Sequence, residues 1–204
     1  MVISGASSGI GKRFAETVNT AGNFDEVWVI ARSIDRLEAL KETVPFPIRA
    51  IALDLSDKTS YSTLEKLLTE EKPSIRLLVN ASGFGKFCAT LDAPLDVNLN
   101  MIDLNCEAIV ALCQLAIPHM EKGAKIINIA SVAAFQPIPY INVYGATKAF
   151  VLSYSRALNR ELRSRGIGVL GGKISDVTAL TLPAAPVEGV EPMERRLVVV
   201  DKVK

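Results

Sequence analysis

A tyrosine and a lysine four residues apart carry the clearest chemical signal in this sequence. In VYGATKAF, residues 143–150, three residues separate Tyr144 from Lys148. On a helix, residues four apart lie on one face, about one turn from each other. An ammonium beside a phenol favours the phenolate, so Lys148 should lower the pKa of Tyr144 and suit it to proton transfer near neutral pH. The same spacing also occurs in ordinary surface contacts of a helix.

The elements that would position this pair are predicted from the apolar pattern. Short runs rich in valine and isoleucine alternate with longer amphipathic runs, which is typical of βαβ units and of an α/β fold with a parallel sheet. We predict strands at 1–4, 26–31, 48–53, 75–79, 124–130 and 167–170, and helices at 9–21, 34–43, 57–71, 98–121 and 143–165. Predicted N-caps are Ser33 and Ser56, and predicted helix ends are Gly22, Gly123 and Gly166. Residues 178–192 are predicted to be irregular, with a further candidate strand at 197–200.

Length and charge narrow the class of protein. A chain of 204 residues is long enough for one domain with a sizeable core and short for two. The net charge is +1, so the composition lacks the excess of basic residues that is typical of proteins that bind nucleic acid or an anionic membrane. We therefore expect a single domain over residues 1–204 that acts on a small molecule.

Cysteine and histidine content indicates the compartment and argues against a metal centre. Cys88, Cys106 and Cys113 show no CxxC spacing, which favours reduced thiols. The only histidine, His119, follows a proline near the end of a predicted helix, so we predict no metal site. The sequence has no signal-peptide pattern, and we expect no apolar stretch to reach the roughly 18 residues of a membrane span. A soluble, cytoplasmic protein is the expectation.

A glycine-rich turn follows the first predicted strand. The stretch SGASSGIGK places Gly5, Gly9 and Gly11 where the strand must turn into a helix. Glycines there let the backbone approach a pyrophosphate, whose charge meets the free N–H groups of the helix N-terminus. Such turns can also merely shape loops, but this position between strand and helix favours a dinucleotide site.

Taken together, the sequence motifs of this chain resemble those of the short-chain dehydrogenase/reductase (SDR) family. The glycine turn, LDL at 53–55, NASG at 80–83, Asn105, Ser131, and Tyr144 with Lys148 occur in the family's order over residues 1–170. The resemblance implies a Rossmann-type, doubly wound sheet, a nicotinamide cofactor, and an oxidoreductase that interconverts a carbonyl and an alcohol. It also implies a homodimer or homotetramer, because helices 98–121 and 143–165 correspond to those that pair between subunits in many members.

The resemblance implies a role for each catalytic candidate. Tyr144 would be the general acid and base, and Lys148 would also bind the nicotinamide ribose. Ser131 would polarise the substrate oxygen, and Asn105 would distort its helix and hold a water that relays protons to the lysine. Each residue also has a plainer reading: a serine at a strand end is often a cap, and an asparagine within a helix often points at solvent.

The same resemblance implies a set of cofactor-binding residues. Asp54 would bind the adenine amine and the backbone of Leu55 would face that ring, although Asp54 could instead share a helix N-cap with Ser56. Arg32 follows the second strand where NAD-specific proteins carry an acid, so we predict NADP(H) over NAD(H), unless the arginine is simply solvated. The full predicted set is Gly5, Ser7, Ser8, Gly9, Ile10, Gly11, Arg32, Asp54, Leu55, Asn80, Ala81, Ser82, Gly83, Tyr144 and Lys148.

The chain departs from the family pattern after residue 170. Within the matched region, Ala81 replaces an asparagine that is usual in the family. The later stretch GGKISDVTALTLPAAP lacks the usual Pro-Gly turn. Gly171 and Gly172 could supply a turn instead, and Thr178 could supply a hydroxyl. The segment 171–204 is shorter than is usual in the family. An alternative function is therefore a nucleotide-binding SDR-like protein that has little or no turnover because its substrate lid is lost.

Overall fold

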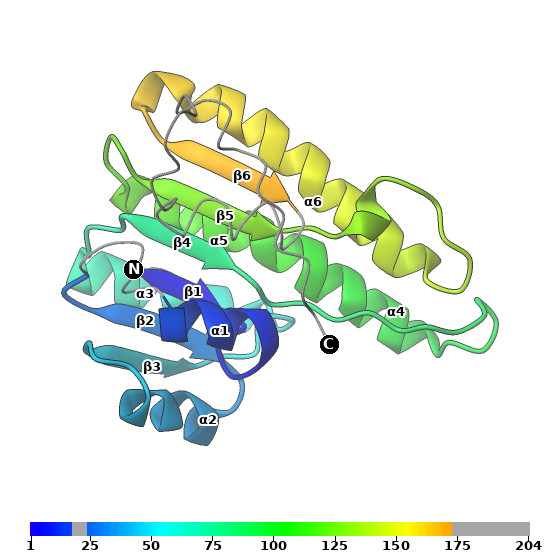
Figure 1. Cartoon of the computed structure of the whole chain (residues 1–204), viewed down its shortest axis with the longest axis horizontal. Helices are drawn as coiled ribbons and strands as arrows, with labels where there is room; N and C mark the ends of the chain where they lie inside the picture. Colours follow the sequence, from blue (N-terminus) through cyan, green and yellow to red (C-terminus); the bar gives the residue numbers. More distant parts are fainter. Residues whose placement is uncertain (18–23, 173–204) are drawn as a thin grey trace, which may run out of the picture.

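Six parallel strands form the centre of the fold (Figure 1). The structure, a computed structural model, describes residues 1–17 and 24–172. The strand order is β3-β2-β1-β4-β5-β6, which confirms the predicted doubly wound α/β sheet. The strands are β1 Val2–Ser4, β2 Val27–Ala31, β3 Ile48–Ala52, β4 Leu77–Asn80, β5 Lys125–Ile129 and β6 Gly168–Gly172. Each overlaps the strand predicted for it, whereas the candidate strand at 197–200 lies outside the described residues.

Helices cover both faces of this sheet. The α-helices are α1 Gly9–Thr17, α2 Ile34–Glu38, α3 Thr59–Glu71, α4 Leu95–Ile102, α5 Ala108–Ala116 and α6 Asn142–Glu161. Short 3-10 segments are η2 Ala39–Glu42, η4 Ile117–His119, η5 Val132–Ala134 and η6 Leu162–Arg165, and η3 Asp103–Glu107 is a π-helix. Figure 1 shows α1 in front of the sheet, with α3 and α5 behind it.

Alternating residues of each strand pack into two separate hydrophobic cores, one on each face of the sheet. Successive side chains of a strand point to opposite faces, and here both faces are buried. Val2 packs with the core that contains α3, α5 and α6, whereas its neighbour Ile3 packs with the core that contains α1 and α2. Both side chains are at most 4% exposed. This explains why the strands appear in the sequence as continuous apolar runs.

The helical run Leu95–His119 joins α4, η3, α5 and η4. Contrary to the sequence expectation, it is long and apolar enough to cross a membrane by length and composition alone. The core helix of a soluble protein passes the same test, and here Ile109, Leu112 and Cys113 are buried in the core beneath the sheet. Packing against the sheet therefore accounts for the apolar composition of α5, whereas Leu95, Leu99 and Ile102 of α4 are exposed.

Three of the predicted helix boundaries are wrong, and one of them is the start predicted at 98, because α4 begins at Leu95. α3 begins at Thr59, not after Ser56, because the carboxylate of Asp57 accepts the Thr59 N–H at 2.9 Å. The long run ends at His119, so Gly123 lies in the following turn and does not end the helix. Ser33 does occupy the N-cap position of α2, without a side-chain hydrogen bond to it. Gly166 ends η6 in the left-handed conformation, as predicted, and Gly22 lies outside the described residues.

Gly171 and Gly172 do not form the expected turn. Both belong to β6, where they pair in register with Asn128 and Ile129 of β5. A Cβ built on Gly171 would lie 2.4 Å from the Cβ of Ser155 on α6. The glycine is therefore explained by close packing between a strand and a helix. Thr178 lies outside the described residues.

Candidate active site

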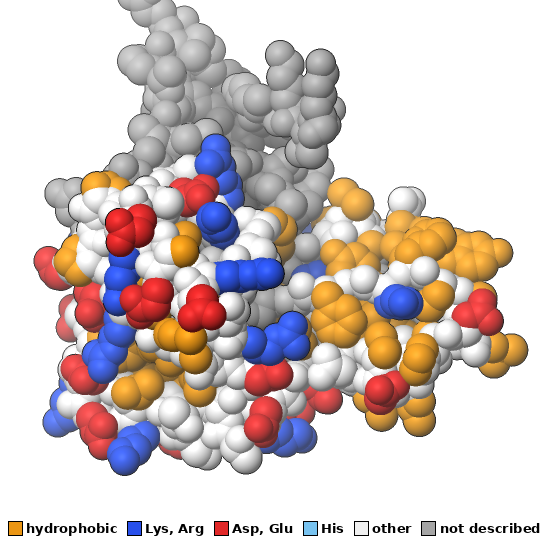
Figure 2. Space-filling model, turned by 90° about the horizontal axis from the view of Figure 1, so that it is seen from below, with side chains coloured by type: hydrophobic (Ala, Val, Ile, Leu, Met, Phe, Trp, Pro, Cys, Tyr) orange, Lys and Arg blue, Asp and Glu red, His pale blue; other side chains and the backbone are white. Residues whose placement is uncertain are grey.

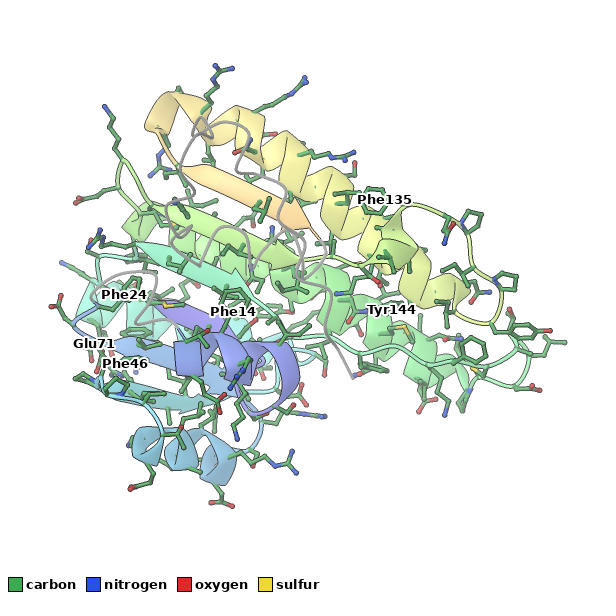
Figure 3. The ribbon with its side chains drawn as sticks, in the orientation of Figure 1. Phe14, Phe24, Phe46, Glu71, Phe135 and Tyr144 are labelled. Atoms are coloured by element: carbon green, nitrogen blue, oxygen red, sulfur yellow. The ribbon has the colours of Figure 1, made fainter. Side chains whose placement is uncertain are left out.

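A pocket of about 620 Å³ opens where β4 and β5 end and α1 and α6 begin. In open parallel sheets, ligands bind at the carboxyl ends of the strands, at the point where the strand order reverses. Here that point lies between β1 and β4. Figure 3 shows Tyr144 near the start of α6, beyond the ends of the strands. The lining residues are Ile10, Ala81, Gly83, Phe84, Gly85, Ile129, Ala130, Ser131, Val132, Tyr144 and Lys148.

Tyr144 and Lys148 both face this pocket from α6. The Lys148 Nζ lies 5.7 Å from the centroid of the Tyr144 ring, which places the cation at the aromatic face. The ammonium also donates a hydrogen bond of 2.8 Å to the carbonyl of Ile129. The side chain is only 5% exposed, and this burial lowers the pKa of Lys148 to about 8. The site therefore holds a cation that is poorly hydrated and close to the phenol.

Asn105 lies inside the π-helix that interrupts the long helical run. Its side chain is fully buried, so the reading in which it points at solvent is wrong. Its Oδ1 accepts the Phe84 N–H at 3.0 Å, and its Nδ2 donates to the Phe84 carbonyl at 2.9 Å. A π-turn of this kind is frequent at functional sites, and it matches the distortion that the resemblance implied.

Ser131 is a cap residue that also lies at the pocket. It is the N-cap of η5, where its Oγ accepts the Ala133 N–H at 3.2 Å. It also lines the pocket together with Tyr144 and Lys148. Because the hydroxyl acts as an acceptor in the cap, its hydrogen remains available to donate to a bound oxygen.

The turn between β1 and α1 has the close approach that a dinucleotide requires. A Cβ on Gly11 would lie 2.4 Å from the Gly5 carbonyl oxygen, and a Cβ on Gly5 would lie 2.7 Å from the Ser82 nitrogen. Gly5 and Gly9 also have positive φ angles of 70° and 53°, which favour glycine. Only glycines therefore allow this turn to approach the loop after β4. Ser7 and Ser8 lie within the turn.

The loop after β4 is tied to this turn by Ser4. The Ser4 hydroxyl accepts the N–H groups of Ala81 and Ser82, at 3.2 and 3.3 Å. Ala81 lines the pocket with Ile10 of α1 and with Gly83. The replacement of the usual asparagine by Ala81 thus leaves the backbone arrangement in place. These residues fit a nicotinamide dinucleotide, whose pyrophosphate would lie at the α1 N-terminus.

Arg32 and Asp54 lie at the ends of the neighbouring strands. Arg32 directly follows β2, is exposed, and forms no side-chain hydrogen bond or ion pair with another residue of the described ranges. The Asp54 Oδ1 accepts both the N–H and the hydroxyl of Ser56, at 3.0 and 2.7 Å. Asp54 thus stabilises a turn two residues after β3 rather than a helix N-cap. Leu55 is buried, and its carbonyl accepts the Tyr61 hydroxyl at 2.9 Å.

The Asn80 side chain lies inside the fold and does not line the pocket. It is 1% exposed, and its Nδ2 donates to the Asn128 Oδ1 at 2.8 Å. Asn128 in turn donates to the Ser155 Oγ of α6 at 2.9 Å. Among the predicted cofactor residues, Asn80 is therefore placed to join two strands to a helix. Asn128 and Ser155 were missed from the sequence because neither belongs to a motif.

The three cysteines and the histidine lie outside the pocket lining. None of Cys88, Cys106 and Cys113 forms a disulfide with another described residue. Burial raises the pKa of the Cys106 and Cys113 thiols to about 11, so neither is an activated nucleophile. Across residues 1–17 and 24–172, no cluster of three metal-ligating side chains is found. His119 ends η4, where its carbonyl accepts the Ile75 N–H.

Comparison with known proteins gives the same assignment from sequence and from structure. The family model for short chain dehydrogenases matches residues 1–176. The very-long-chain 3-oxoacyl-CoA reductase of Homo sapiens is 34% identical over 178 residues, which cover 82% of this chain and 56% of the human protein. The chain therefore spans just over half the length of that relative.

Two solved structures are similar to most of this chain. A short-chain dehydrogenase from Sphingobium yanoikuyae in complex with NADPH has a TM-score of 0.72 and 32% identity, covering 81% of this chain and 66% of that one. A 4-hydroxyisoleucine dehydrogenase complexed with NADH and succinate has a TM-score of 0.68 and 26% identity, covering 81% of this chain and 74% of that one. With the family model matching most of its residues, this chain belongs to the short-chain dehydrogenase family of NAD(P)-dependent oxidoreductases.

Proposed function

We propose that the protein interconverts a carbonyl and an alcohol, with Tyr144 as the general acid and base. The observation that carries this proposal is one pocket in which Tyr144, Lys148 and Ser131 meet Ile10, which follows the glycine-rich turn, and Ala81 and Gly83 of the loop after β4. A bound nicotinamide dinucleotide supplies the hydride, or accepts it in the reverse direction. In the reductive direction, Tyr144 donates its phenolic proton to the oxygen of the substrate as the carbonyl carbon gains the hydride.

The neighbouring side chains lower the barrier for this proton transfer. The ammonium of Lys148 stabilises the phenolate that Tyr144 becomes, and its burial strengthens this interaction because little water screens it. Ser131 donates a hydrogen bond to the same substrate oxygen and fixes its position. Asn105 keeps the helix distorted, and we propose that the freed backbone of the π-turn holds a water that returns a proton to Lys148.

The cofactor is proposed to be NADP(H) rather than NAD(H). Arg32 follows β2 and forms no ion pair within the described residues, so its guanidinium is free to bind a 2′-phosphate. Ser33, at the N-cap of α2, has no side-chain cap hydrogen bond, which leaves its hydroxyl available for the same phosphate. Structural relatives do not decide the preference, because one was solved with NADPH and another with NADH.

The assembly is proposed to be a homodimer or homotetramer. Leu95, Leu99 and Ile102 follow helical spacing along α4 and are 72%, 50% and 43% exposed. Phe150 of α6 is also exposed and stacks on Tyr154. Figure 2 shows apolar side chains gathered at the end of the molecule where α4 begins. Apolar helix faces of this kind are typical of subunit contacts, and light scattering after Leu99→Glu would show a monomer if α4 forms that contact.

For either function we propose a cytoplasmic location. A second candidate function is nucleotide binding without turnover. It is favoured by the sequence from Gly171 onward, which departs from the family pattern and of which residues 173–204 lie outside the described residues. The intact arrangement of Asn105, Ser131, Tyr144 and Lys148 favours catalysis instead. The two candidates differ in a single observable, which is oxidation or reduction of a bound nicotinamide.

A panel of carbonyl compounds tests the proposal and includes a 3-oxoacyl thioester and bulky apolar ketones. Oxidation of NADPH is followed by its absorbance with the parent protein and with Tyr144→Phe. Turnover should fall by about 10²-fold or more in the variant, the scale of general acid catalysis, while cofactor affinity is retained. Equal turnover by the two proteins would contradict the role of Tyr144. Cofactor binding without turnover on any substrate would favour the second candidate.

A further inference from the structure

Thr147 lies between the two catalytic candidates and touches the scaffold of both. It is only 3% exposed, on the inner side of α6. Its Oγ1 donates a hydrogen bond of 2.7 Å to the backbone carbonyl of Tyr144 and accepts one of 3.0 Å from the Asn105 Nδ2. A single buried hydroxyl thus joins the turn of α6 that carries the phenol to the π-turn of the preceding helical run.

Asn105 transmits this connection to the loop after β4. Its amide binds both the N–H and the carbonyl of Phe84, so that the backbone of one residue is held at two points. Gly83 and Gly85 flank this residue. A Cβ on Gly83 would lie 2.7 Å from the Asn105 Oδ1 and 3.5 Å from the Lys148 Nζ. The loop is therefore fixed directly beside the site.

Gly85 returns the chain of contacts to the tyrosine ring. A Cβ built on Gly85 would lie 2.9 Å from the Tyr144 Cδ2 and 3.0 Å from its Cγ, which is closer than real Cβ atoms normally approach. The backbone of Gly85 therefore packs directly against the Tyr144 ring, with no room for a side chain between them. Contacts run from Tyr144 through Thr147, Asn105 and Phe84 to Gly85 and back to the ring.

We propose that Thr147 is a positioning residue for the Tyr144 phenol. Its hydroxyl fixes the backbone beneath the ring and, through Asn105, holds Gly85 against the ring. The kinetic consequence rests on the proposed function, in which that phenol transfers a proton to the substrate. Because a displacement of about 1 Å in a catalytic group can lower a rate by about 10²-fold, the loss of one distant hydroxyl should be visible in turnover.

Two substitutions at one position separate the hydroxyl from the volume of the side chain. Thr147→Val keeps the shape and removes the hydroxyl, which leaves one N–H of Asn105 without its partner. Thr147→Ser keeps the hydroxyl and is the matched control. We expect kcat of Thr147→Val to fall by about 10-fold or more, with the dissociation constant for NADPH nearly unchanged. Thr147→Ser should restore most of the turnover.

A measurement that does not depend on turnover accompanies the kinetics. Ring signals of ¹³C-labelled tyrosine, assigned to Tyr144 by their loss in Tyr144→Phe, should shift or broaden in Thr147→Val and return in Thr147→Ser. Unchanged ring signals and unchanged kcat in Thr147→Val would overturn the positioning role. If Tyr144→Phe keeps full turnover, the proposed function fails, and the ring signals alone still decide the position of the phenol.

A second variant covers the case in which Thr147→Val does not fold. Gly85→Ala leaves the hydrogen bonds of Thr147 in place and pushes a methyl group into the ring of Tyr144. It should shift the same ring signals and lower kcat by about 10-fold or more, without changing NADPH binding to the same degree. Normal ring signals and normal kcat in this variant would overturn the proposed contact.

Discussion

Replacing Lys148 by methionine should make the cofactor-free protein more stable while removing its activity. Methionine keeps much of the length of the side chain and carries no charge. Burial lowers the pKa of Lys148 from 10.5 to about 8, so the folded protein holds the ammonium less readily than the unfolded chain does. One pKa unit corresponds to about 1.4 kcal/mol, and the buried charge therefore costs the folded state about 3 kcal/mol below pH 8.

The net gain is smaller than this cost because the lysine also makes a hydrogen bond. Its Nζ donates to the Ile129 carbonyl at 2.8 Å, and losing that bond offsets about 1 kcal/mol. A net stabilisation of about 2 kcal/mol is expected at pH 7. Because the folded-state pKa is the lower one, the cost of the charge is present below pH 8 and disappears as the pH rises from about 8 toward 10.5.

Urea unfolding of the cofactor-free protein at pH 7 and at pH 10 measures this effect. Lys148→Met should be more stable than the parent at pH 7, and the difference should shrink or change sign at pH 10. Lys125→Met is the control, because Lys125 is exposed at the start of β5 and its substitution should change stability by at most about 0.5 kcal/mol at either pH. A destabilised Lys148→Met at pH 7, or a gain that does not depend on pH, would refute the reasoning.

Two further predictions follow from single contacts. Arg32→Ala should weaken NADPH binding by about 10-fold or more and leave NADH binding nearly unchanged, because a hydrogen bond to a charged group is worth about 1.5 to 3 kcal/mol; an unchanged ratio of the two affinities in calorimetric titration would exclude Arg32 as the selector. Gly171→Ala should lower stability by about 1 to 3 kcal/mol, since its Cβ would lie 2.4 Å from the Ser155 Cβ; a thermal midpoint equal to that of the parent would show that β6 and α6 are packed less closely.

The sheet could be predicted because its residues obey simple local rules. The central strands β1, β2 and β4 are short apolar runs, and parallel strands covered on both faces produce that pattern whatever else the protein does. The glycine-rich turn could also be predicted from the sequence, because the close approach of Gly11 to the Gly5 carbonyl leaves no room for a side chain at position 11. Helical spacing predicted that Tyr144 and Lys148 share one face of a helix, and both line the same pocket.

What the sequence did not predict depends on contacts between distant segments. The π-turn at Asn105 was expected only through the family resemblance, because it has no local signature and Asn105 bonds the Phe84 backbone 21 residues away. Gly171 was expected in a turn, and only the position of Ser155 on a neighbouring helix explains it. Thr147 appeared to be a spacer between two catalytic residues until its hydrogen bond to Asn105 was known.

Transfer of deuterium from the cofactor tests the central claim most directly. NADPH that carries deuterium on one face of nicotinamide C4 is incubated with the protein and a carbonyl substrate, and the product is analysed by mass spectrometry. The claim predicts that one of the two labelled faces delivers a single deuterium to the former carbonyl carbon, and that Tyr144→Phe suppresses this transfer by about 10²-fold. Oxidation of the cofactor without deuterium in the product from either face, or equal transfer by Tyr144→Phe, would contradict it.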